Sequence, residues 1–270
     1  IQADDFSGRN IHFGIREHAM AAICNGISLH GGIRPYCSTF LVFVDYMKHA
    51  VRLSALMKQP VIYVLTHDSV YVGEDGPTHE PIEQTESLRI IPNCRVFRPA
   101  DANETRLAWI EAIKRKDGPT CLVLTRQDLP TIAADRVPRD GFAKGGYVLK
   151  KETSDKPDLV LVAAGSEVSL CMETAEMLEA DGVQVRVVSM PSRELFMSQD
   201  KEYRESVLTS APKVAVEIGV GDGWYQIAGT DGLVYSLQRF GESGPGEQVA
   251  ALLGFTADAL RKAIKDKFGL

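Results

Sequence analysis

The sequence predicts an α/β protein made of two domains with parallel β-sheets. Short β-branched runs alternate with helical segments along the chain, and the strand-like runs are apolar throughout. Such strands are typical of parallel sheets that helices cover on both faces. A polar stretch rich in Pro, Asp and Gly separates two blocks of this alternation. We therefore expect one domain at residues 1–135, a linker at 136–146 and a second domain at 147–270.

Each block contains apolar strands and intervening helices. In the first block the predicted strands are Pro60–Thr66, Cys94–Pro99 and Pro119–Arg126, and the predicted helices are Ala19–Leu29, Phe40–Lys58 and Ala102–Lys116. The last of these helices has apolar residues at Leu107, Ile110 and Ile113 and charges on its other face, which is the spacing of an amphipathic helix. In the second block the predicted strands are Asp158–Gly165, Val183–Met190 and Lys213–Gly219, and the predicted helices are Glu167–Ala180 and Ala257–Phe268.

Composition excludes several classes of function. The net charge is −6 with acids and bases interleaved, so nothing favours binding to nucleic acid or to an acidic membrane. No apolar run reaches the roughly 18 residues that cross a bilayer, and no signal peptide is evident. The 5 cysteines form no Cys-x-x-Cys pair and lie among apolar neighbours, which predicts reduced, buried thiols in a cytoplasmic protein.

The first predicted helix is preceded by three ionisable residues, Arg16, Glu17 and His18. The run that follows is nearly all small or apolar, as in a helix packed on several sides. A carboxylate at this point is either a charge that complements the helix dipole or a working acid. Without further motifs, the residues favour the interpretation that Glu17 complements the helix dipole.

A long charged loop follows the predicted strand Pro60–Thr66. Its sequence, "THDSVYVGEDGPTHEPIEQ", contains His67, Asp75 and His79 together with glycines and a proline that bend the backbone. Loops at the carboxyl ends of parallel strands commonly carry function. A metal site is a weaker reading, because the two histidines lie far apart in sequence without helical spacing.

Longer motifs resemble transketolases. The segments "GIREHAMAAICNGISLHGG", "STFLVFVDYMKHAVRLSALMKQ", "THDSVYVGEDGPTHEPIEQTESLR", "PADANETRLAW" and "GPTCLVLTRQ" stand in the order and spacing of that family. The resemblance covers nearly the whole chain and is densest from Ile11 to Gln127. It implies a pyrimidine-binding domain that lacks its first strand, followed by the family's C-terminal domain with a mixed sheet, each three layers deep.

The resemblance also implies an activity and its cofactors. Transketolases transfer a two-carbon ketol unit from a ketose phosphate to an aldose phosphate in the pentose phosphate pathway and the Calvin cycle, with thiamine diphosphate and Mg²⁺. Glu17 matches the carboxyl that hydrogen-bonds the ring nitrogen of the cofactor's aminopyrimidine across a subunit interface and so activates the cofactor. Phe43 matches the aromatic residue that stacks on the pyrimidine, and Phe40 helps to line its pocket.

Four further residues match the family's substrate site. Asp75 resembles the carboxylate that binds the C-2 hydroxyl of the sugar, and His79 resembles the imidazole near the substrate carbonyl, a proton donor or hydrogen-bond partner. His67 and Arg126 resemble part of the site for the sugar phosphate. A guanidinium suits this task because its planar fork matches phosphate oxygens.

The matching segments do not include the residues that bind the metal and the diphosphate, which lie in the family's amino-terminal domain. The Gly-Asp-Gly at Gly221–Gly223 has no asparagine in the window where the family's metal site needs one, so we expect a simple turn. "AAGSEVSL", Ala163–Leu170, could take an anion at a helix start, but a structural role is favoured. We expect this chain to hold half of an active site and to be inactive alone.

Three accounts of the chain remain open. It is the C-terminal part of a transketolase, which the start at Ile1 favours, or the natural second subunit of a split enzyme, or a non-catalytic scaffold. In the first two cases we expect a homodimer through the pyrimidine-binding domain, or a pair with an amino-terminal half chain. The apolar helices Met20–Leu29 and Leu41–Met57 carry more hydrophobic surface than one small sheet covers, which also predicts self-association.

Overall fold

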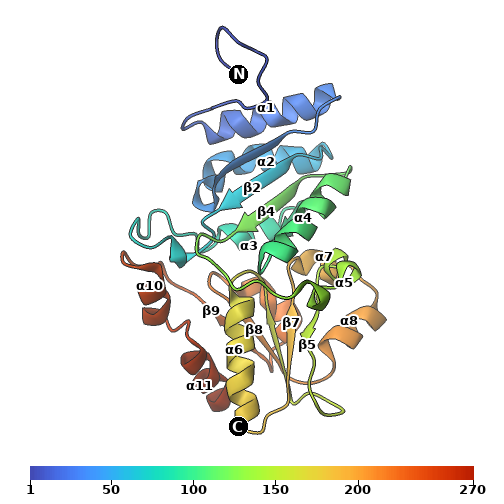
Figure 1. Ribbon diagram of the computed structural model, residues 1–270, viewed down its shortest axis with the longest axis vertical. Coiled ribbons are helices and arrows are strands. Elements are labelled where there is room, and N and C mark those ends of the chain that lie inside the picture. The colour runs from blue at the N-terminus through green and yellow to red at the C-terminus, as the bar shows by residue number, and fades with distance from the viewer.

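The computed structural model describes the whole chain, Ile1–Leu270, and contains two β-sheets that lie one above the other (Figure 1). The first sheet has the strand order β1-β2-β4-β3 and is parallel throughout. The second has the order β5-β7-β6-β8-β9, in which β5 runs antiparallel to β7 and every other pair is parallel. The predicted α/β class, with an all-parallel first sheet and a mixed second sheet, is confirmed.

The first sheet lies between two layers of helix. Its elements are, in chain order, α1 (Glu17–His30), β1 (Tyr36–Phe40), η1 (Leu41–Phe43), α2 (Val44–Leu56), β2 (Ile62–Thr66), η2 (Val70–Val72), α3 (Gln84–Arg89), β3 (Arg95–Phe97), α4 (Ala102–Lys114) and β4 (Thr120–Leu124). Alternate residues of β2 point to opposite faces, as the twofold repeat of a strand requires. Tyr63 and Leu65 pack with α1 and α2, whereas Ile62 and Val64 pack with α4.

The second sheet begins after two short helices in the connecting segment. The remaining elements are η3 (Ala134–Arg136), α5 (Arg139–Ala143), β5 (Tyr147–Lys150), β6 (Leu159–Ala163), α6 (Glu167–Ala180), β7 (Val185–Ser189), α7 (Arg193–Met197), α8 (Lys201–Leu208), β8 (Lys213–Glu217), η4 (Asp222–Trp224), α9 (Tyr225–Ala228), β9 (Leu233–Ser236), α10 (Gly246–Leu252) and α11 (Ala257–Phe268). Helices α6 and α11 cover one face, and α7, α8 and α9 contribute to the core on the other.

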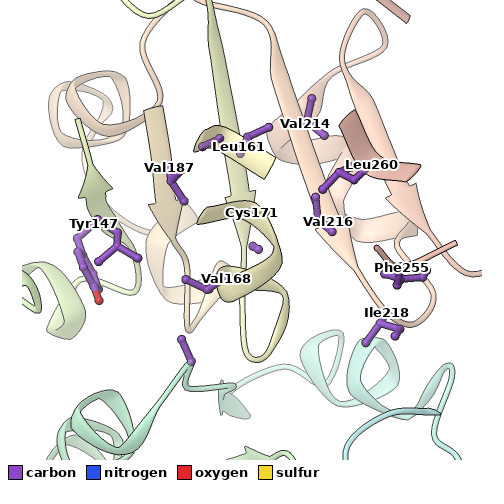
Figure 2. Close-up of a cluster of buried hydrophobic side chains, with 14 of the residues drawn as sticks. Tyr147, Leu161, Val168, Cys171, Val187, Val214, Val216, Ile218, Phe255 and Leu260 are labelled. Carbon is purple, nitrogen blue, oxygen red and sulfur yellow. The ribbon is translucent and has the colours of Figure 1, made fainter. Parts of the chain in front are cut away.

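One hydrophobic core runs from the α4 face of the first sheet into the α6 face of the second. Figure 2 shows its second-sheet part, in which Leu161, Val187 and Val214 meet Val168 and Cys171 of α6. All of these side chains are almost completely buried. Because this core crosses from one sheet to the other, the two halves of the chain are packed as one body.

One predicted element is wrong at its start. The helix expected from Phe40 to Lys58 begins only at Val44, because Tyr36–Phe40 forms the edge strand β1 and Leu41–Phe43 forms a single 3₁₀ turn. Short apolar runs do not separate strand from helix by periodicity, and here pairing of β1 with β2 decides in favour of the strand. The sequence analysis also missed β5 and β9, which are short edge strands of the second sheet.

The cysteines behave as predicted, since all five are buried and unpaired in disulfides. None of the helices is both long and apolar enough to span a bilayer.

Candidate active site

The carboxyl edge of the first sheet gathers most of the candidate residues. Strands β1, β2 and β4 are neighbours, and Phe40, Thr66 and Leu124 are paired in register at their ends. Phe40 is therefore the last residue of β1, His67 follows β2 directly, and Arg126 lies two residues beyond β4. Crevices at this edge are where open parallel sheets bind ligands.

Aromatic rings form a partly exposed cluster at this edge. The ring of Phe40 stacks on that of His67, with centroids 3.6 Å apart and an interplanar angle of 16°. Phe40 and Phe43 are also nearly parallel, at 6.2 Å and 12°. His79 meets Phe43 edge-on at 5.4 Å. These four side chains are half-buried, so their rings are held by the protein yet remain accessible to a planar ligand.

Tyr46 is an aromatic residue at this site that the sequence analysis missed. Its ring lies 6.2 Å from that of Phe43, and its side chain is 68% exposed. The signal was present in the sequence, because Phe40, Phe43 and Tyr46 recur every three residues. A Tyr that is exposed beside two half-buried Phe rings extends the aromatic surface towards solvent.

His67 has an unusual backbone and a perturbed imidazole. Its φ of +60° is left-handed, a region that is uncommon for residues other than glycine, although His adopts it more often than most. Its Nδ1 lies 2.9 Å from the hydroxyl of Thr66. Burial lowers the pKa of His67 below its ordinary value and the positive charge of Arg126 lowers it further, whereas Asp75 and Asp68 oppose the change. The imidazole is thus close enough to interact with three charged side chains, two from its own loop and one from the segment after β4.

Arg126 and Asp75 project from this edge with their side chains exposed. Both act on the pKa of His67, so the structure brings these three predicted substrate residues together. A guanidinium, an imidazole and a carboxylate around an aromatic surface can bind a polyhydroxylated, anionic ligand. The guanidinium suits the anion, and the carboxylate can accept from hydroxyls.

The second domain closes over the loop that carries His67, Asp75 and His79. Gly73 and Gly76 have φ of +86° and +75°, and a Cβ on Gly76 would lie 2.1 Å from the hydroxyl oxygen of Ser243. A Cβ on Gly246 would lie 2.9 Å from the backbone of Tyr71. Glycine is required where two backbones approach this closely. The loop 67–80 and the segment 241–246 are therefore fitted to each other.

Glu17 is the one catalytic candidate that stands apart from these contacts. It is the first residue of α1 and is half-buried, and the residue before it, Arg16, forms no side-chain cap at the start of the helix. No hydrogen bond or ion pair joins its carboxylate to the aromatic cluster. Its role as cofactor activator stays a prediction.

Two other motifs have structural roles. Gly221–Gly223 leads into the 3₁₀ turn η4, as expected of a simple turn. In "AAGSEVSL" the helix start at Ser166 and Glu167 is buried, and Glu167 pairs with the equally buried Arg98. No group of three or more His, Cys, Asp or Glu side chains is arranged to hold a metal ion.

Comparison with known proteins agrees with the geometry. The family model described as the transketolase pyrimidine-binding domain matches residues 2–131, and that of the transketolase-like C-terminal domain matches residues 145–256. The transketolase of Geobacillus stearothermophilus is 50% identical over 269 residues, which are 98% of this chain and 40% of that protein. A transketolase of Vibrio parahaemolyticus is 48% identical over 98% of this chain and 40% of its own length.

Solved structures give the same result. A Pichia stipitis transketolase in complex with sedoheptulose 7-phosphate superposes with a TM-score of 0.91 at 43% identity, over 97% of this chain and 38% of the other. A split-gene transketolase described as an inactive β4 tetramer superposes with a TM-score of 0.79 at 27% identity, over 95% of this chain and 83% of the other. The chain spans about two fifths of the length of the curated relatives it matches. It belongs to the transketolase family, of which it contains the pyrimidine-binding domain followed by the C-terminal domain.

Proposed function

We propose that this chain forms the pyrimidine- and sugar-binding half of a transketolase active site, which transfers a two-carbon ketol unit between sugar phosphates. The observation that carries the proposal is the convergence of the aromatic cluster with His67, Asp75 and Arg126 at the carboxyl edge of the first sheet. This edge offers a stacking surface for a heteroaromatic ring beside groups suited to a sugar phosphate.

Thiamine diphosphate fits the aromatic part of the site. Phe40, Phe43 and Tyr46 present accessible ring faces on one side of the chain, and the aminopyrimidine of the cofactor is a planar ring of matching size. When bound, the cofactor supplies the nucleophilic carbon for the ketol unit. Glu17 would hold a proton at the pyrimidine nitrogen, which requires a carboxyl free of other partners. Mg²⁺ and the diphosphate would be held by an amino-terminal domain.

The four substrate-binding candidates would bind different parts of the sugar phosphate. Arg126 is exposed and offers a bidentate fork to the phosphate, with His67 beside it. Burial and the charge of Arg126 lower the pKa of His67, which favours its neutral form and a role as a hydrogen-bonding group. Asp75 would accept from the sugar C-2 hydroxyl. His79, packed edge-on against Phe43, would donate to the substrate carbonyl.

A partner surface is also present. The outward face of α1 and the turn after it line an open groove of about 870 Å³, and five of its eight residues are hydrophobic. Ile23, Leu29 and Ile33 are 45%, 55% and 70% exposed in this region. We infer that this face binds a second copy of the pyrimidine-binding domain or an amino-terminal half chain, since exposed apolar patches mark interfaces. The match to most of a split-gene relative favours keeping the second option.

The test is a substitution at Glu17 in the enzyme completed with an amino-terminal transketolase domain, joined to the chain or added separately. Glu17→Gln keeps the shape but loses the acidic proton, and we expect deuterium exchange at the cofactor's thiazolium carbon to slow about a hundredfold, or about 2.7 kcal/mol. Glu173→Gln on the exposed face of α6 is the matched control and should exchange normally. Near-normal exchange in Glu17→Gln, with cofactor binding intact, would contradict the proposed role and favour the helix-dipole interpretation.

A further inference from the structure

A buried ion-pair network joins the two sheets beneath the substrate loop. Arg98 follows β3 and is 1% exposed, and its Nε donates to Asp68 Oδ2 at 2.7 Å. Its Nη1 donates to Glu167, where α6 begins, and to Glu217 Oε1 at 3.2 Å, where β8 ends. Glu217 is also paired with Arg89 at 2.8 Å. Arg98 and Arg89 thus share three buried carboxylates, those of Asp68, Glu167 and Glu217. The network continues from Arg89 to Glu86 and Arg193, which add one charge of each sign.

The second domain is shaped around Arg98. The backbone N–H of Gly165 donates to the carbonyl of Arg98 at 2.9 Å, and the N–H of Arg98 donates to the carbonyl of Pro191 at 2.8 Å. Gly165 has a φ of +62°, and a Cβ there would lie 2.8 Å from the guanidinium carbon. Arg98 directly follows β3 of the first sheet, yet the second domain contacts both its backbone and its side chain.

This network reaches the substrate site through one residue. Asp68 directly follows His67, whose left-handed backbone is of a kind that persists only where neighbouring contacts over-determine it. Two contacts hold the chain on either side of this left-handed residue. The His67 ring stacks on Phe40, and Arg98 donates a hydrogen bond to Asp68. If the bond from Arg98 to Asp68 is lost, the His67 ring keeps only its stack on Phe40 and its local contact with the Thr66 hydroxyl.

We propose that Asp68 and Arg98 are positioning residues, which transmit the fixed geometry of the second domain to the imidazole of His67. Glu167 and Glu217 anchor the guanidinium, the guanidinium holds Asp68, and Asp68 fixes the backbone that places His67 over Phe40. The kinetic consequence rests on the proposed function, whereas the structural consequence does not. In this arrangement the C-terminal domain helps to shape the sugar-phosphate site without contacting the substrate.

Charge balance identifies the informative variant. Replacing Arg98 would leave Asp68, Glu167 and Glu217 with Arg89 as their one paired arginine, and unpaired buried charges strongly destabilise a protein. Removing Asp68 instead leaves Arg98 and Arg89 facing Glu167 and Glu217, with equal numbers of each charge. Asp68→Ala should therefore fold while freeing His67. Asp68→Asn restores an acceptor oxygen at the same place and should rescue the position.

A matched control exists at the far side of the second domain. Arg261 Nε donates to Asp181 Oδ2 at 2.8 Å, the same kind of bond as that between Arg98 and Asp68. Asp181 lies at the end of α6, away from the substrate loop. Asp181→Ala removes an Arg–Asp pair without any path to His67.

The first experiment measures the position of the His67 ring in this 270-residue chain by NMR with selectively labelled histidine. The Phe40 ring at 3.6 Å shifts the His67 ring protons upfield, and Phe40→Leu identifies that contribution. We expect Asp68→Ala to lose most of the upfield shift, Asp68→Asn to retain most of it and Asp181→Ala to retain all of it. An unchanged shift in folded Asp68→Ala would overturn the proposal.

Glu167→Gln tests the contribution of the second domain separately. It also leaves two arginines with two carboxylates, and it changes a residue that does not adjoin His67 in the chain. We expect part of the upfield shift to be lost. A full shift in this variant would overturn the role of the second domain, and it would do so even if Asp68→Ala failed to fold.

Kinetics in the completed enzyme separate positioning from mere stability. If His67 binds the sugar phosphate equally in ground and transition states, Asp68→Ala raises KM for the ketose phosphate about tenfold with kcat within about twofold. A purely structural defect would reduce the active fraction, which lowers kcat and leaves KM unchanged. If the completed wild-type enzyme has no ketol transfer activity, the proposed function fails, whereas the NMR result still decides whether Asp68 positions His67.

Discussion

Glu80 gives a prediction whose sign and size follow from the structure. It ends the substrate loop, is 2% exposed, and neither of its carboxylate oxygens has a hydrogen-bond partner. A Cβ on Gly241 of the second domain would lie 1.7 Å from its Oε2, so the loop 241–246 covers it directly. Burial raises the pKa of Glu80 from 4.5 to about 7.

The raised pKa makes the stability of the fold depend on pH. Between pH 4.5 and about 7 the folded protein keeps a proton on Glu80 that the unfolded chain has lost, so stability falls as pH rises through this window. The full pKa difference corresponds to at most about 3.4 kcal/mol. Local relaxation and water penetration reduce such penalties, so we expect about 1–2 kcal/mol to be measured.

Glu80→Gln removes the ionisable group but adds a buried amide, whose cost does not depend on pH. The informative quantity is therefore the change in its effect between pH 5 and pH 8. We expect the variant to gain about 1–2 kcal/mol relative to wild type between these values, measured by urea unfolding with circular dichroism. Glu74→Gln, an exposed site in the same loop, is the control and should show no such gain. An equal effect of Glu80→Gln at both pH values would refute the reasoning.

Three further predictions concern packing, association and cofactor binding. Gly241→Ala should destabilise the fold by about 1–3 kcal/mol through its clash with Glu80. Gly244→Ala in the same segment, where a Cβ would have its nearest neighbour at 3.5 Å, should have little effect, and thermal unfolding of both variants compares them. Ile23→Asp in the apolar groove should weaken self-association in sedimentation, and Leu252→Asp, at an even more exposed site on α10, should not. A wild-type chain that stays monomeric at micromolar concentration would contradict the proposed partner surface. The chain alone should show no ketol transfer, and micromolar binding of thiamine diphosphate with Mg²⁺ in calorimetry would contradict the view that its diphosphate ligands lie elsewhere.

The sequence predicts the fold where the pattern is local and strong. All six predicted strands and the helices α4, α6 and α11 are present, because long apolar runs and amphipathic spacing are each sufficient to specify these elements. The prediction fails at Phe40, because Tyr36–Phe40 forms a strand by pairing with the edge of β2. Such pairing is a tertiary contact that no local pattern contains.

Motifs in the sequence suggested residues for the candidate site, but nothing in the sequence suggested the ion pairs that support its loop. Motifs identified His67, Asp75 and Arg126, and the strand order explains why they meet. Nothing in the sequence indicated that Arg98 would pair with Glu167 and Glu217, which are 69 and 119 residues away. Charged residues are usually exposed, so the default expectation for each was a solvated surface.

These buried supports change how the second domain is understood. The second domain contributes two carboxylates to Arg98 and a glycine-rich segment to the covering of Glu80. Both contacts act on the loop 67–80, one at its first residues and one at its last. A loop with a left-handed histidine and a buried carboxyl is not held by its own strand alone, because each of these features opposes folding. The ion pairs to Arg98 offset the first of these costs, whereas the segment 241–246 is itself what buries Glu80. The loop 67–80 therefore takes its shape from residues that are distant in the sequence.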